Sequence, residues 1–269
     1  MIKPYQHQID KAEECWKILK SKGYVYLAGK PRSGKTLTSL LIAEHSDKIN
    51  SVLILTKKQA IAGWEKFLND VELKHSYKVT NYEQAGKWDA TKRKPIFKLN
   101  KADYDLVIID ESHNLGTVGK PSGRFKVIKS LCYDMPHIHL SGTAIVESPN
   151  SIYHQMAISK YNPFRFKNFY DFFRKYGEPY YIKAAGRDIA QYDRFKPELL
   201  DAINEFTVYV DTPISLYLKP KYNKILTEVK NKGIYKYHNV TFTIANGSLP
   251  EFEEQLRNNK IERKYYEIN

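Results

Sequence analysis

The sequence contains few cysteines and no long apolar run. Cys15 and Cys132 are the only cysteines among 269 residues, which is too few for a disulfide framework or a cysteine-rich zinc site. Both lie in apolar or amphipathic runs, so we expect buried free thiols. No stretch approaches the roughly 18 apolar residues of a membrane span, and no apolar segment follows the charged N-terminus. The sequence predicts a soluble, intracellular protein without a membrane partner.

The sequence also lacks internal repeats and low-complexity tracts, and basic residues outnumber acidic ones. Lys and Arg total 43 against 30 Asp and Glu, for a formal net charge of +13. Such an excess favours a polyanionic partner, because Lys and Arg neutralise phosphates and release counterions. Composition alone leaves two readings open, nucleic-acid binding and a solvated basic surface.

Residues 29–36 read G-K-P-R-S-G-K-T, which matches the phosphate-binding pattern G-x-x-x-x-G-K-[ST]. A short β-rich run precedes the pattern at residues 24–28, and a helix-compatible apolar run follows it at residues 37–43. In such a loop, successive backbone N–H groups wrap phosphate oxygens. Lys35 is expected to reach the β- and γ-phosphates, and the Thr36 hydroxyl to bind Mg²⁺. We predict nucleotide contacts at Gly29, Lys30, Pro31, Arg32, Ser33, Gly34, Lys35 and Thr36. The alternative is a surface turn rich in glycine and lysine.

Strand-like and helix-like segments alternate along the chain. We predict strands at residues 24–28, 51–56, 77–80, 105–109, 137–141 and 206–210, and helices at residues 9–20, 37–43, 61–68 and 125–131. Residues 84–102 are polar and rich in lysine, which suggests a surface excursion. The alternation implies an α/β fold with a parallel sheet and right-handed crossovers. Ligands of such sheets bind at the carboxyl ends of the strands.

The sequence changes character after Pro149. Residues 151–183 are rich in aromatic side chains, which we expect to be mostly helical and to pack in a core rather than stack on bases. Residues 214–269 are rich in Lys and Tyr. There, residues 241–244 followed by Asn246-Gly247 suggest a small hairpin, and residues 251–263 a helix. We therefore predict a first domain at residues 1–213 and an extension at residues 214–269.

Asp110-Glu111-Ser112-His113 directly follows the apolar strand that ends at Ile109. A carboxylate at a strand end that faces the phosphate loop holds Mg²⁺ in NTPases. An adjacent Glu polarises the attacking water as a general base. We therefore predict Asp110 as a metal-site residue and Glu111 as the general base. The alternative, two exposed acids after a strand, is disfavoured by the position on a buried strand.

Further short segments occur in a fixed order along the chain. They are K-P-Y-Q-H at residues 3–7, L-I-L-T at residues 53–56 with G-W-E at residues 63–65, T-N-Y-E at residues 80–83, L-S-G-T-A-I at residues 140–145 with S-P-N at residues 148–150, and F-Y-D-F-F-R-K-Y-G at residues 169–177. Several such matches in order are far more specific than any one of them. The whole set, over roughly residues 3–215, resembles the first RecA-like lobe of a superfamily-two helicase. It is most similar to the Swi/Snf-type DNA translocases, especially the small versions of bacteriophages.

The resemblance implies a DNA-dependent ATPase with ATP and Mg²⁺ as cofactors, in the cytoplasm of the cell or of a bacterial host. The resemblance implies that Gln6 contacts the adenine. It also implies that Thr36 and Asp110 together hold Mg²⁺. It assigns Ser141 and Thr143 to coupling between the nucleotide and the DNA. By position, the expected contacts with the DNA backbone are Thr56, Lys57, Lys58, Thr80 and Asn81. For Lys57 and Lys58 a solvated lysine pair is the alternative, and the basic loop at residues 119–124 is either a further contact or an exposed turn.

The sequence departs from the family pattern in three ways. Ala144 stands where the third helicase motif usually has Pro, and Lys30-Pro31-Arg32 replaces the usual approach to the phosphate loop. No Q-x-x-G-R-x-x-R motif follows, although the second lobe of these motors supplies arginine fingers from it. Gly186-Arg187 lies in a polar, irregular stretch and is interpreted as a surface turn.

We therefore expect the second lobe on another chain or in a missing segment. Slow hydrolysis is expected from the lobe alone, since an arginine finger contributes about 10³ to 10⁵ in rate. Two alternatives stay open, a single-lobe regulatory module that binds nucleotide or DNA and a fragment of a full helicase. A P-loop kinase is disfavoured because S-G-T follows D-E-S-H on successive strands.

Overall fold

The computed structural model describes residues 2–29, 32–117, 119–142, 151–184, 186–192 and 194–210, together with the strands at residues 234–237 and 240–243. The chain divides into two compact units, Met1–Asp211 and Thr212–Asn269. The first unit carries every motif of the sequence analysis. In the second unit the structure describes one antiparallel hairpin, β11 (Ile234–Tyr237) with β12 (Val240–Thr243).

A six-stranded sheet forms the centre of the first unit, in the order β10-β1-β7-β6-β2-β3, and every neighbouring pair is parallel. Its strands are β1 (Tyr24–Ala28), β2 (Ser51–Thr56), β3 (Ser76–Asn81), β6 (Leu106–Ile109), β7 (His137–Ser141) and β10 (Thr207–Tyr209). The predicted α/β fold with a parallel sheet is thereby confirmed. Because all six strands run the same way, their carboxyl ends meet at one edge.

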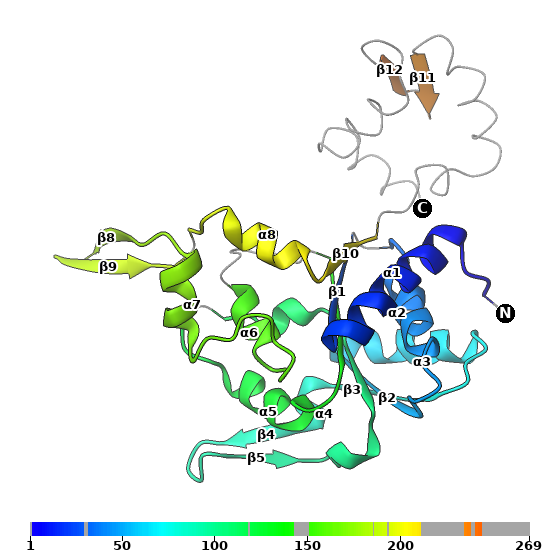
Figure 1. Ribbon diagram of the computed structural model, residues 1–269, viewed down its shortest axis with the longest axis horizontal. Helices are drawn as coiled ribbons and strands as arrows, with labels where there is room; N and C mark the ends of the chain where they lie inside the picture. The colour runs from blue at the N-terminus through cyan, green and yellow to red at the C-terminus, as the bar shows by residue number, and fades with distance from the viewer. Residues whose placement is uncertain are drawn as a thin grey trace. The chain divides into compact units, whose positions relative to one another are not determined.

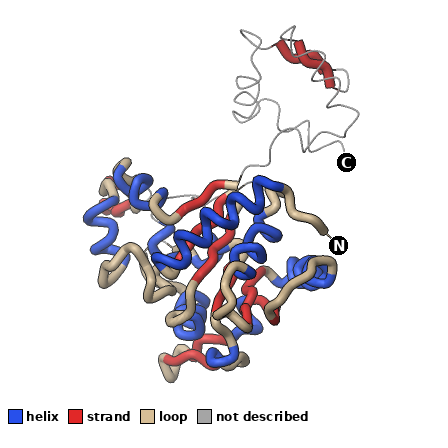
Figure 2. The backbone as a smooth tube through the Cα atoms, turned by 45° about the vertical axis from the view of Figure 1, so that its right-hand side comes forward, coloured by secondary structure: helices blue, strands red, loops and turns tan. Residues whose placement is uncertain are grey.

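Helices cover both faces of this sheet (Figures 1 and 2). They are α1 (Gln6–Lys22), α2 (Lys35–Glu44), α3 (Ile61–Asn69), α4 (Tyr82–Ala85), α5 (Gly123–Cys132), α6 (Ile152–Met156), α7 (Phe169–Tyr176) and α8 (Glu198–Asn204), with 3₁₀ turns η1 (Lys58–Ala60), η2 (Lys101–Asp103) and η3 (Ser112–Leu115). Residues of α1 to α3 pack in one core and residues of α5 to α8 in another. Strand β1 shows the division: Tyr24 and Tyr26 belong to the α5–α8 core, Val25 and Leu27 to the other. Successive side chains of a strand alternate between faces, so a strand buried on both sides is apolar throughout.

The aromatic segment at residues 151–183 is less helical than predicted. It contains only the short helices α6 and α7 in its described part, and β8 (Tyr180–Ala184) begins within it. Pro163 and Pro179 lack the backbone N–H that a continuous helix needs, which explains the interruption. Its aromatic rings do form a core as expected, with Phe164 and Phe172 in edge contact at 5.1 Å between centroids.

Two hairpins were not predicted from the sequence. β8 pairs with β9 (Arg187–Gln191), so Arg187 begins a strand, and Gly186 takes the turn with φ of 72°. The lysine-rich excursion contains β4 (Gly86–Asp89) and β5 (Lys94–Phe97), joined by a turn in which Asp89 Oδ1 accepts from two backbone amides. Short, exposed strands of this kind carry little of the apolar alternation that sequence patterns detect.

The remaining expectations concern the second unit and the cysteines. Residues 241–243 of the expected hairpin lie in β12, which pairs antiparallel with β11. Asn246, Gly247 and the helix predicted at residues 251–263 lie outside the described residues. Cys15 and Cys132 are buried free thiols, as expected. Among the described residues, no helix is both long and apolar enough to span a membrane.

Candidate functional site

The predicted motif residues gather at the carboxyl edge of the sheet. The register of β2 and β3 places Thr56 opposite Asn81, and that of β1 and β7 places Ala28 opposite Ser141. Asp110 follows the end of β6, which lies between β2 and β7. The phosphate-loop pattern and the D-E-S-H segment therefore share one edge, where parallel α/β sheets bind ligands.

The phosphate-loop segment leads from β1 into α2. Gly34 is the N-cap of α2, with φ of 86°, and Arg32 also has a positive φ of 64°. Positive φ values of this kind orient successive backbone N–H groups toward one point, which forms an anion-binding concavity. The Lys35 ammonium donates to the Gly29 carbonyl at 2.5 Å. Lys30 and Pro31 lie outside the described residues.

The charge on Lys35 responds to two opposing influences. Burial lowers the pKa of Lys35, whereas the negative charges of Glu111 and Asp110 raise it. The ammonium therefore lies within electrostatic reach of both acids. A cation with this environment is suited to a polyanion bound between the loop and the two acids.

Gln8, which sequence reasoning missed, lies against the phosphate loop. It is buried, its Oε1 accepts from Tyr5 N at 2.9 Å and its Nε2 donates to Gly34 O at 3.5 Å. Glycine is favoured at position 34 because φ is 86°, a conformation that residues with a side chain rarely adopt, and a Cβ there would also meet Gln8 Nε2 at 2.1 Å. By contrast, Gln6 is exposed and donates to Asp10 Oδ1 at 2.7 Å. The position of Gln8 three residues after the N-cap Tyr5 was the available signal, since a Glu or Gln there caps the helix start.

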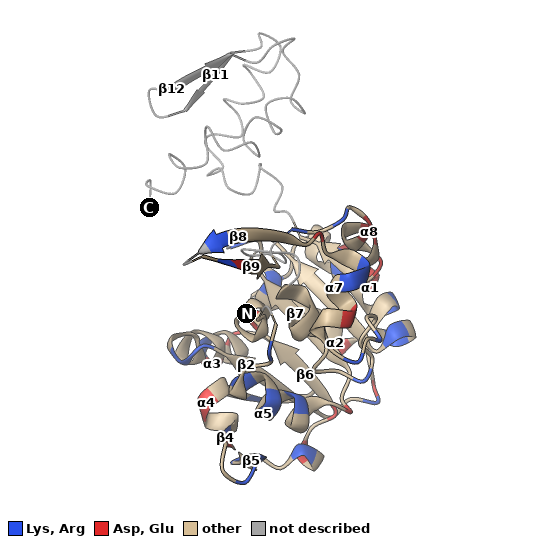
Figure 3. Cartoon of the chain, turned by 90° about the vertical axis from the view of Figure 1, so that its left-hand side faces the viewer, with Lys and Arg blue, Asp and Glu red and all other residues tan. Residues whose placement is uncertain are grey.

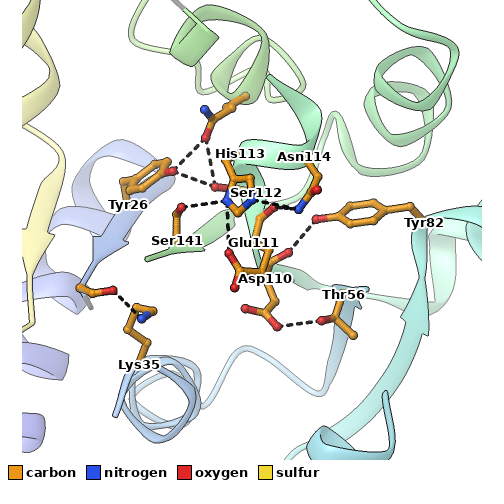
Figure 4. Close-up of polar contacts among 12 residues, drawn as sticks. Tyr26, Lys35, Thr56, Tyr82, Asp110, Glu111, Ser112, His113, Asn114 and Ser141 are labelled. Atoms are coloured by element: carbon orange, nitrogen blue, oxygen red, sulfur yellow. Dashed lines mark hydrogen bonds and ion pairs between the residues drawn. The ribbon is translucent and has the colours of Figure 1, made fainter. Parts of the chain in front are cut away.

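Asp110 is held from several sides (Figure 4). Its Oδ2 accepts from Thr56 Oγ1 at 2.7 Å and from Trp64 Nε1 at 2.9 Å. Its backbone N–H donates to Leu55 O at 2.8 Å, and its carbonyl accepts from the Tyr82 hydroxyl at 2.7 Å. Within the described residues, no hydrogen bond engages Oδ1. The carboxylate thus has a fixed orientation and one oxygen left for a ligand.

Glu111 has an unusual backbone conformation. Its φ and ψ are 51° and 48°, in the left-handed region, which costs a residue with a side chain about 1–3 kcal/mol. Asn114 stabilises this turn by donating to Glu111 O from its backbone N at 3.0 Å and from Nδ2 at 2.6 Å. The Glu111 side chain remains 39% exposed. A strained residue that keeps an accessible carboxylate is typical of a reactive position.

His113 connects Glu111 with β7. Its Nδ1 lies 3.1 Å from Ser141 Oγ and 3.2 Å from Glu111 Oε2. Burial lowers the pKa of His113 and Lys57 adds to this effect, while Glu111 and Asp110 oppose it. The ring is therefore neutral near pH 7, and the contact with Glu111 is not a full ion pair. Thr143, the second predicted coupling residue, lies outside the described residues.

The predicted metal residues would supply only part of the ligands of a Mg²⁺ ion. Among the described residues, no group of three or more His, Cys, Asp and Glu side chains surrounds a common point. Mg²⁺ is commonly held by one or two carboxylates, substrate phosphates and water rather than by an all-protein cage. Asp110 Oδ1 is an oxygen ligand of the required kind, so the donor set is compatible with a magnesium ion that arrives with phosphates.

The five predicted DNA contacts fall into two groups. Thr56, Thr80 and Asn81 are buried. Asn81 Oδ1 accepts from the backbone of Glu83 and Gln84 and so caps α4. These three side chains support the scaffold in this structure, and direct contact with DNA would require them to leave their present partners. Lys57 and Lys58 are exposed.

A buried polar network behind the site also escaped sequence analysis. The Tyr26 hydroxyl donates to Gln155 Oε1 at 2.8 Å, and Ser112 Oγ lies 2.9 Å from the Tyr26 hydroxyl and 3.2 Å from Gln155 Oε1. It ties the segment after Glu111 to β1 and α6. No sequence pattern marks such a contact, because its members are far apart in the chain.

Comparison with known proteins gives a match at the level of structure only. No protein-family profile matches the sequence, and no curated protein matches it. The Sulfolobus solfataricus SWI2/SNF2 ATPase core in complex with dsDNA is similar with a TM-score of 0.55 and 19% identity, over 86% of this chain and 54% of that chain. The same ATPase core domain in another structure gives 0.56 and 16%, over 95% and 58%.

At this identity the likeness establishes the fold, which is that of part of a SWI2/SNF2 ATPase core. The chain spans a little more than half the length of those two structures. Together with the parallel sheet, the likeness confirms the RecA-like α/β fold class.

Proposed function

We propose that this chain is the ATP-binding lobe of a DNA-dependent ATPase of the Swi/Snf type. The observation that carries the proposal is the shared edge: the loop with Lys35 follows β1 and the Asp110-Glu111 pair follows β6, and β7 alone separates these two parallel strands in the sheet. A fold resembling that of a SWI2/SNF2 ATPase core supports it. The resemblance of the motifs to small bacteriophage versions of this family supports a phage origin and a place in the host cytoplasm.

In this proposal each residue at the edge has one task. Residues 29–36 bind the phosphates through backbone N–H groups, and Lys35 neutralises their charge. Thr36 and Asp110 hold Mg²⁺, which supplies charge stabilisation for the transferred phosphoryl group. Glu111 accepts the proton of the attacking water as general base. Gln6 contacts the adenine.

The DNA backbone is the proposed second partner. One matched SWI2/SNF2 ATPase core was solved with dsDNA. On this chain the exposed Lys57 and Lys58 follow the carboxyl end of β2, where phosphates would approach without any reading of sequence. Thr80 and Asn81 lie at the end of the adjacent β3 and would contribute if α4 rearranged. Ser141 and Thr143 would report the nucleotide state to this side.

A second RecA-like lobe, on another chain or segment, completes the proposed motor. Without its arginine finger we expect hydrolysis about 10³ to 10⁵ slower than in a complete motor. The coverage of only 54% and 58% of the matched structures favours an alternative as well. In that alternative the lobe binds nucleotide and DNA as a regulatory module without processive movement, or is part of a full helicase.

ATP hydrolysis with and without duplex DNA tests the proposal. We expect DNA-stimulated hydrolysis by the wild type, loss of nucleotide binding in Lys35→Ala, and retained binding without hydrolysis in Glu111→Gln. Lys17→Ala is the matched control, since Lys17 forms only an exposed pair with Glu13 on α1. DNA-stimulated hydrolysis that survives Lys35→Ala would refute the assigned loop. Binding of ATP and DNA without any mutual effect would favour the regulatory module.

A further inference from the structure

We propose that Trp64 is a positioning residue through which the DNA-facing segment Lys57–Lys58 controls the carboxylate of Asp110. The inference rests on the proposed function, because it assumes that Asp110 serves a Mg²⁺–nucleotide complex. It adds a residue and a physical connection between the two ligand sites.

The indole of Trp64 makes a specific polar contact. Its Nε1–H donates to Asp110 Oδ2 at 2.9 Å, and the residue is only 4% exposed. A hydrogen bond to an ionised carboxylate is roughly twice as strong as one between neutral groups. A buried tryptophan usually pairs its N–H with some acceptor; here the acceptor is the carboxylate that the proposed function places at the metal.

Two donors meet on the same oxygen. Thr56 Oγ1 also donates to Asp110 Oδ2, at 2.7 Å (Figure 4). Together the two donors fix the rotation of the carboxylate and engage one oxygen completely. Oδ1, which no described residue engages, is therefore presented to a ligand in one orientation. Loss of either donor would let the carboxylate rotate and weaken whatever Oδ1 binds.

Both donors belong to the chain segment that carries the exposed lysines. Thr56 ends β2 and immediately precedes Lys57, while η1 runs from Lys58 to Ala60 and Trp64 lies in the first turn of α3. The Ala60 N–H donates to Lys57 O at 2.9 Å, which closes this turn. Trp64 is also the one buried residue of α3. A DNA phosphate that binds Lys57 and Lys58 would therefore act on the positions of the two donors to Asp110, because all four residues belong to one short segment.

Electrostatics also connects the lysine segment with the residues around Asp110. The positive charge of Lys57 lowers the pKa of His113, whose Nδ1 is 3.2 Å from Glu111 Oε2. Neutralisation of Lys57 by a DNA phosphate thus alters the field at the general base as well as the geometry at the metal residue. The segment 56–64 is the common element of both effects.

The first test compares nucleotide affinity with and without Mg²⁺ in Trp64→Phe, which keeps a ring but removes the N–H donor. We expect about a tenfold or greater loss of ATP affinity in the presence of Mg²⁺ and no change for metal-free ATP. Trp88→Phe is the matched control, because Trp88 packs under Lys126 on the β4–β5 hairpin. Equal losses under both conditions, or none, would overturn the inference.

A second pair of variants covers the case in which Trp64→Phe does not fold. Thr56→Val removes the other donor to Asp110 with little change of shape, and Thr56→Ser retains it. We expect Thr56→Val to reproduce the Mg²⁺-specific loss and Thr56→Ser to restore wild-type affinity. If Val and Ser behave alike, the two-donor arrangement does not set the metal-linked affinity and the inference falls.

The DNA link is tested by fluorescence. The chain has three tryptophans, so Trp16→Phe/Trp88→Phe leaves Trp64 as the only indole, and its emission responds to the charge at its N–H. We expect separate changes on adding Mg²⁺–ATP and on adding duplex DNA. Lys57→Gln/Lys58→Gln should abolish the DNA response and keep the nucleotide response.

The outcomes separate this inference from the proposed function. Unchanged Trp64 emission in a protein that binds ATP and hydrolyses it with DNA stimulation would refute the inference and leave the ATPase intact. Absence of ATP binding, measured with radiolabelled nucleotide, would refute both.

Discussion

Two polar clusters belong to the same parallel sheet and differ in burial and in charge. One is the site cluster, formed by Thr56, Trp64, Asp110, Glu111 and His113 at the carboxyl edge. The other is the histidine pair, His137 and His139, inside β7. His137 and His139 are fully buried, whereas Asp110, Glu111 and His113 are only partly buried. The site cluster keeps a carboxylate oxygen that no described residue engages and a strained Glu111. The histidine pair consists of neutral rings in contact with each other and with the Cys132 carbonyl, and among the described residues His139 Nδ1 has no hydrogen-bond partner.

The hydrogen bonds of the histidine pair assign its tautomers. His137 Nε2 lies 2.9 Å from the carbonyl of Cys132 and so carries a proton. His137 Nδ1 is then an acceptor, and His139 Nε2–H donates to it at 3.3 Å. Burial lowers the pKa of His137 to about 4 and that of His139 still further. Buried polar groups of this kind stabilise only while they stay neutral, whereas the site cluster contains the two acidic residues Asp110 and Glu111.

The largest effect on activity is expected from a change at Glu111, in the site cluster. Glu111→Gln removes the general base but keeps the size of the side chain. Hydrolysis should fall by about 10² to 10⁴, since this is the usual contribution of a positioned acid or base, while ATP binding persists. Single-turnover hydrolysis and nucleotide titration measure the two quantities. Glu72→Gln, at an exposed position away from the edge, is the control, and a similar decrease in that variant would remove the special role of Glu111.

The histidine pair predicts a loss of stability in acid. Since the folded-state pKa of His137 is about 4 against 6.5 in the unfolded chain, the unfolded state binds the proton first as the pH falls. Stability therefore decreases from about pH 6.5 down to pH 4, by about 3 kcal/mol for His137 alone, at 1.36 kcal/mol per pKa unit. Urea unfolding at several pH values measures this loss.

His137→Leu tests whether this histidine causes the acid sensitivity. The variant should show a flatter dependence of stability on pH, whatever its absolute stability. His45→Gln, at an exposed position, should keep the wild-type profile. An unchanged profile in His137→Leu would assign the acid sensitivity to other groups, such as His154, whose pKa burial also lowers.

The two clusters also differ in how far the sequence predicted them. The phosphate loop and Asp110-Glu111 were predicted because they follow strands buried on both faces, and such strands leave continuous apolar runs. The expected strand at residues 77–80 lies within β3, and the expected helix at residues 61–68 lies within α3. The sequence thus predicted the sheet and the edge at which the motifs meet.

Contacts between distant residues left no such signal. Trp64 and Asp110 lie 46 positions apart, and neither spacing nor periodicity relates an indole N–H to a carboxylate so far along the chain. The same holds for Tyr26 with Gln155 and for Gln8 with Gly34. The prediction for residues 151–183 was wrong because aromatic content indicates burial but does not distinguish a helix from the exposed β8–β9 hairpin.

Tyr26→Phe probes the polar network behind the site cluster. Its effect on stability should lie between that of acid on the histidine pair and that of Lys57→Gln. It removes the hydroxyl between Ser112 and Gln155, both fully buried. Buried partners left without their bond cost about 1–3 kcal/mol. Thermal unfolding measures the change. Tyr209→Phe is the matched control, since its hydroxyl bonds the exposed Asn204 and should matter less; equal losses would contradict a closed network.

The smallest effect on stability is expected at Lys57, which directly follows Thr56 of the site cluster. Lys57 is exposed, one of the basic residues distributed over the surface (Figure 3). Lys57→Gln should change the free energy of unfolding by no more than about 0.5 kcal/mol, as is usual for surface positions. Its effect should appear instead in DNA binding, where removal of one phosphate contact lowers the slope of log affinity against log salt by about 1.

Measuring DNA affinity at several salt concentrations, with Lys17→Gln as the control, distinguishes a DNA contact from a solvated lysine. A parallel shift with an unchanged slope would mean that Lys57 acts through the general charge of the protein. A reduced slope in Lys57→Gln alone would place a phosphate beside the segment that holds Asp110. The polar groups at the carboxyl edge would then differ from the histidine pair in purpose as well as in geometry, since a second molecule would complete the bonding of Asp110, whereas the two histidines are fully buried inside the sheet.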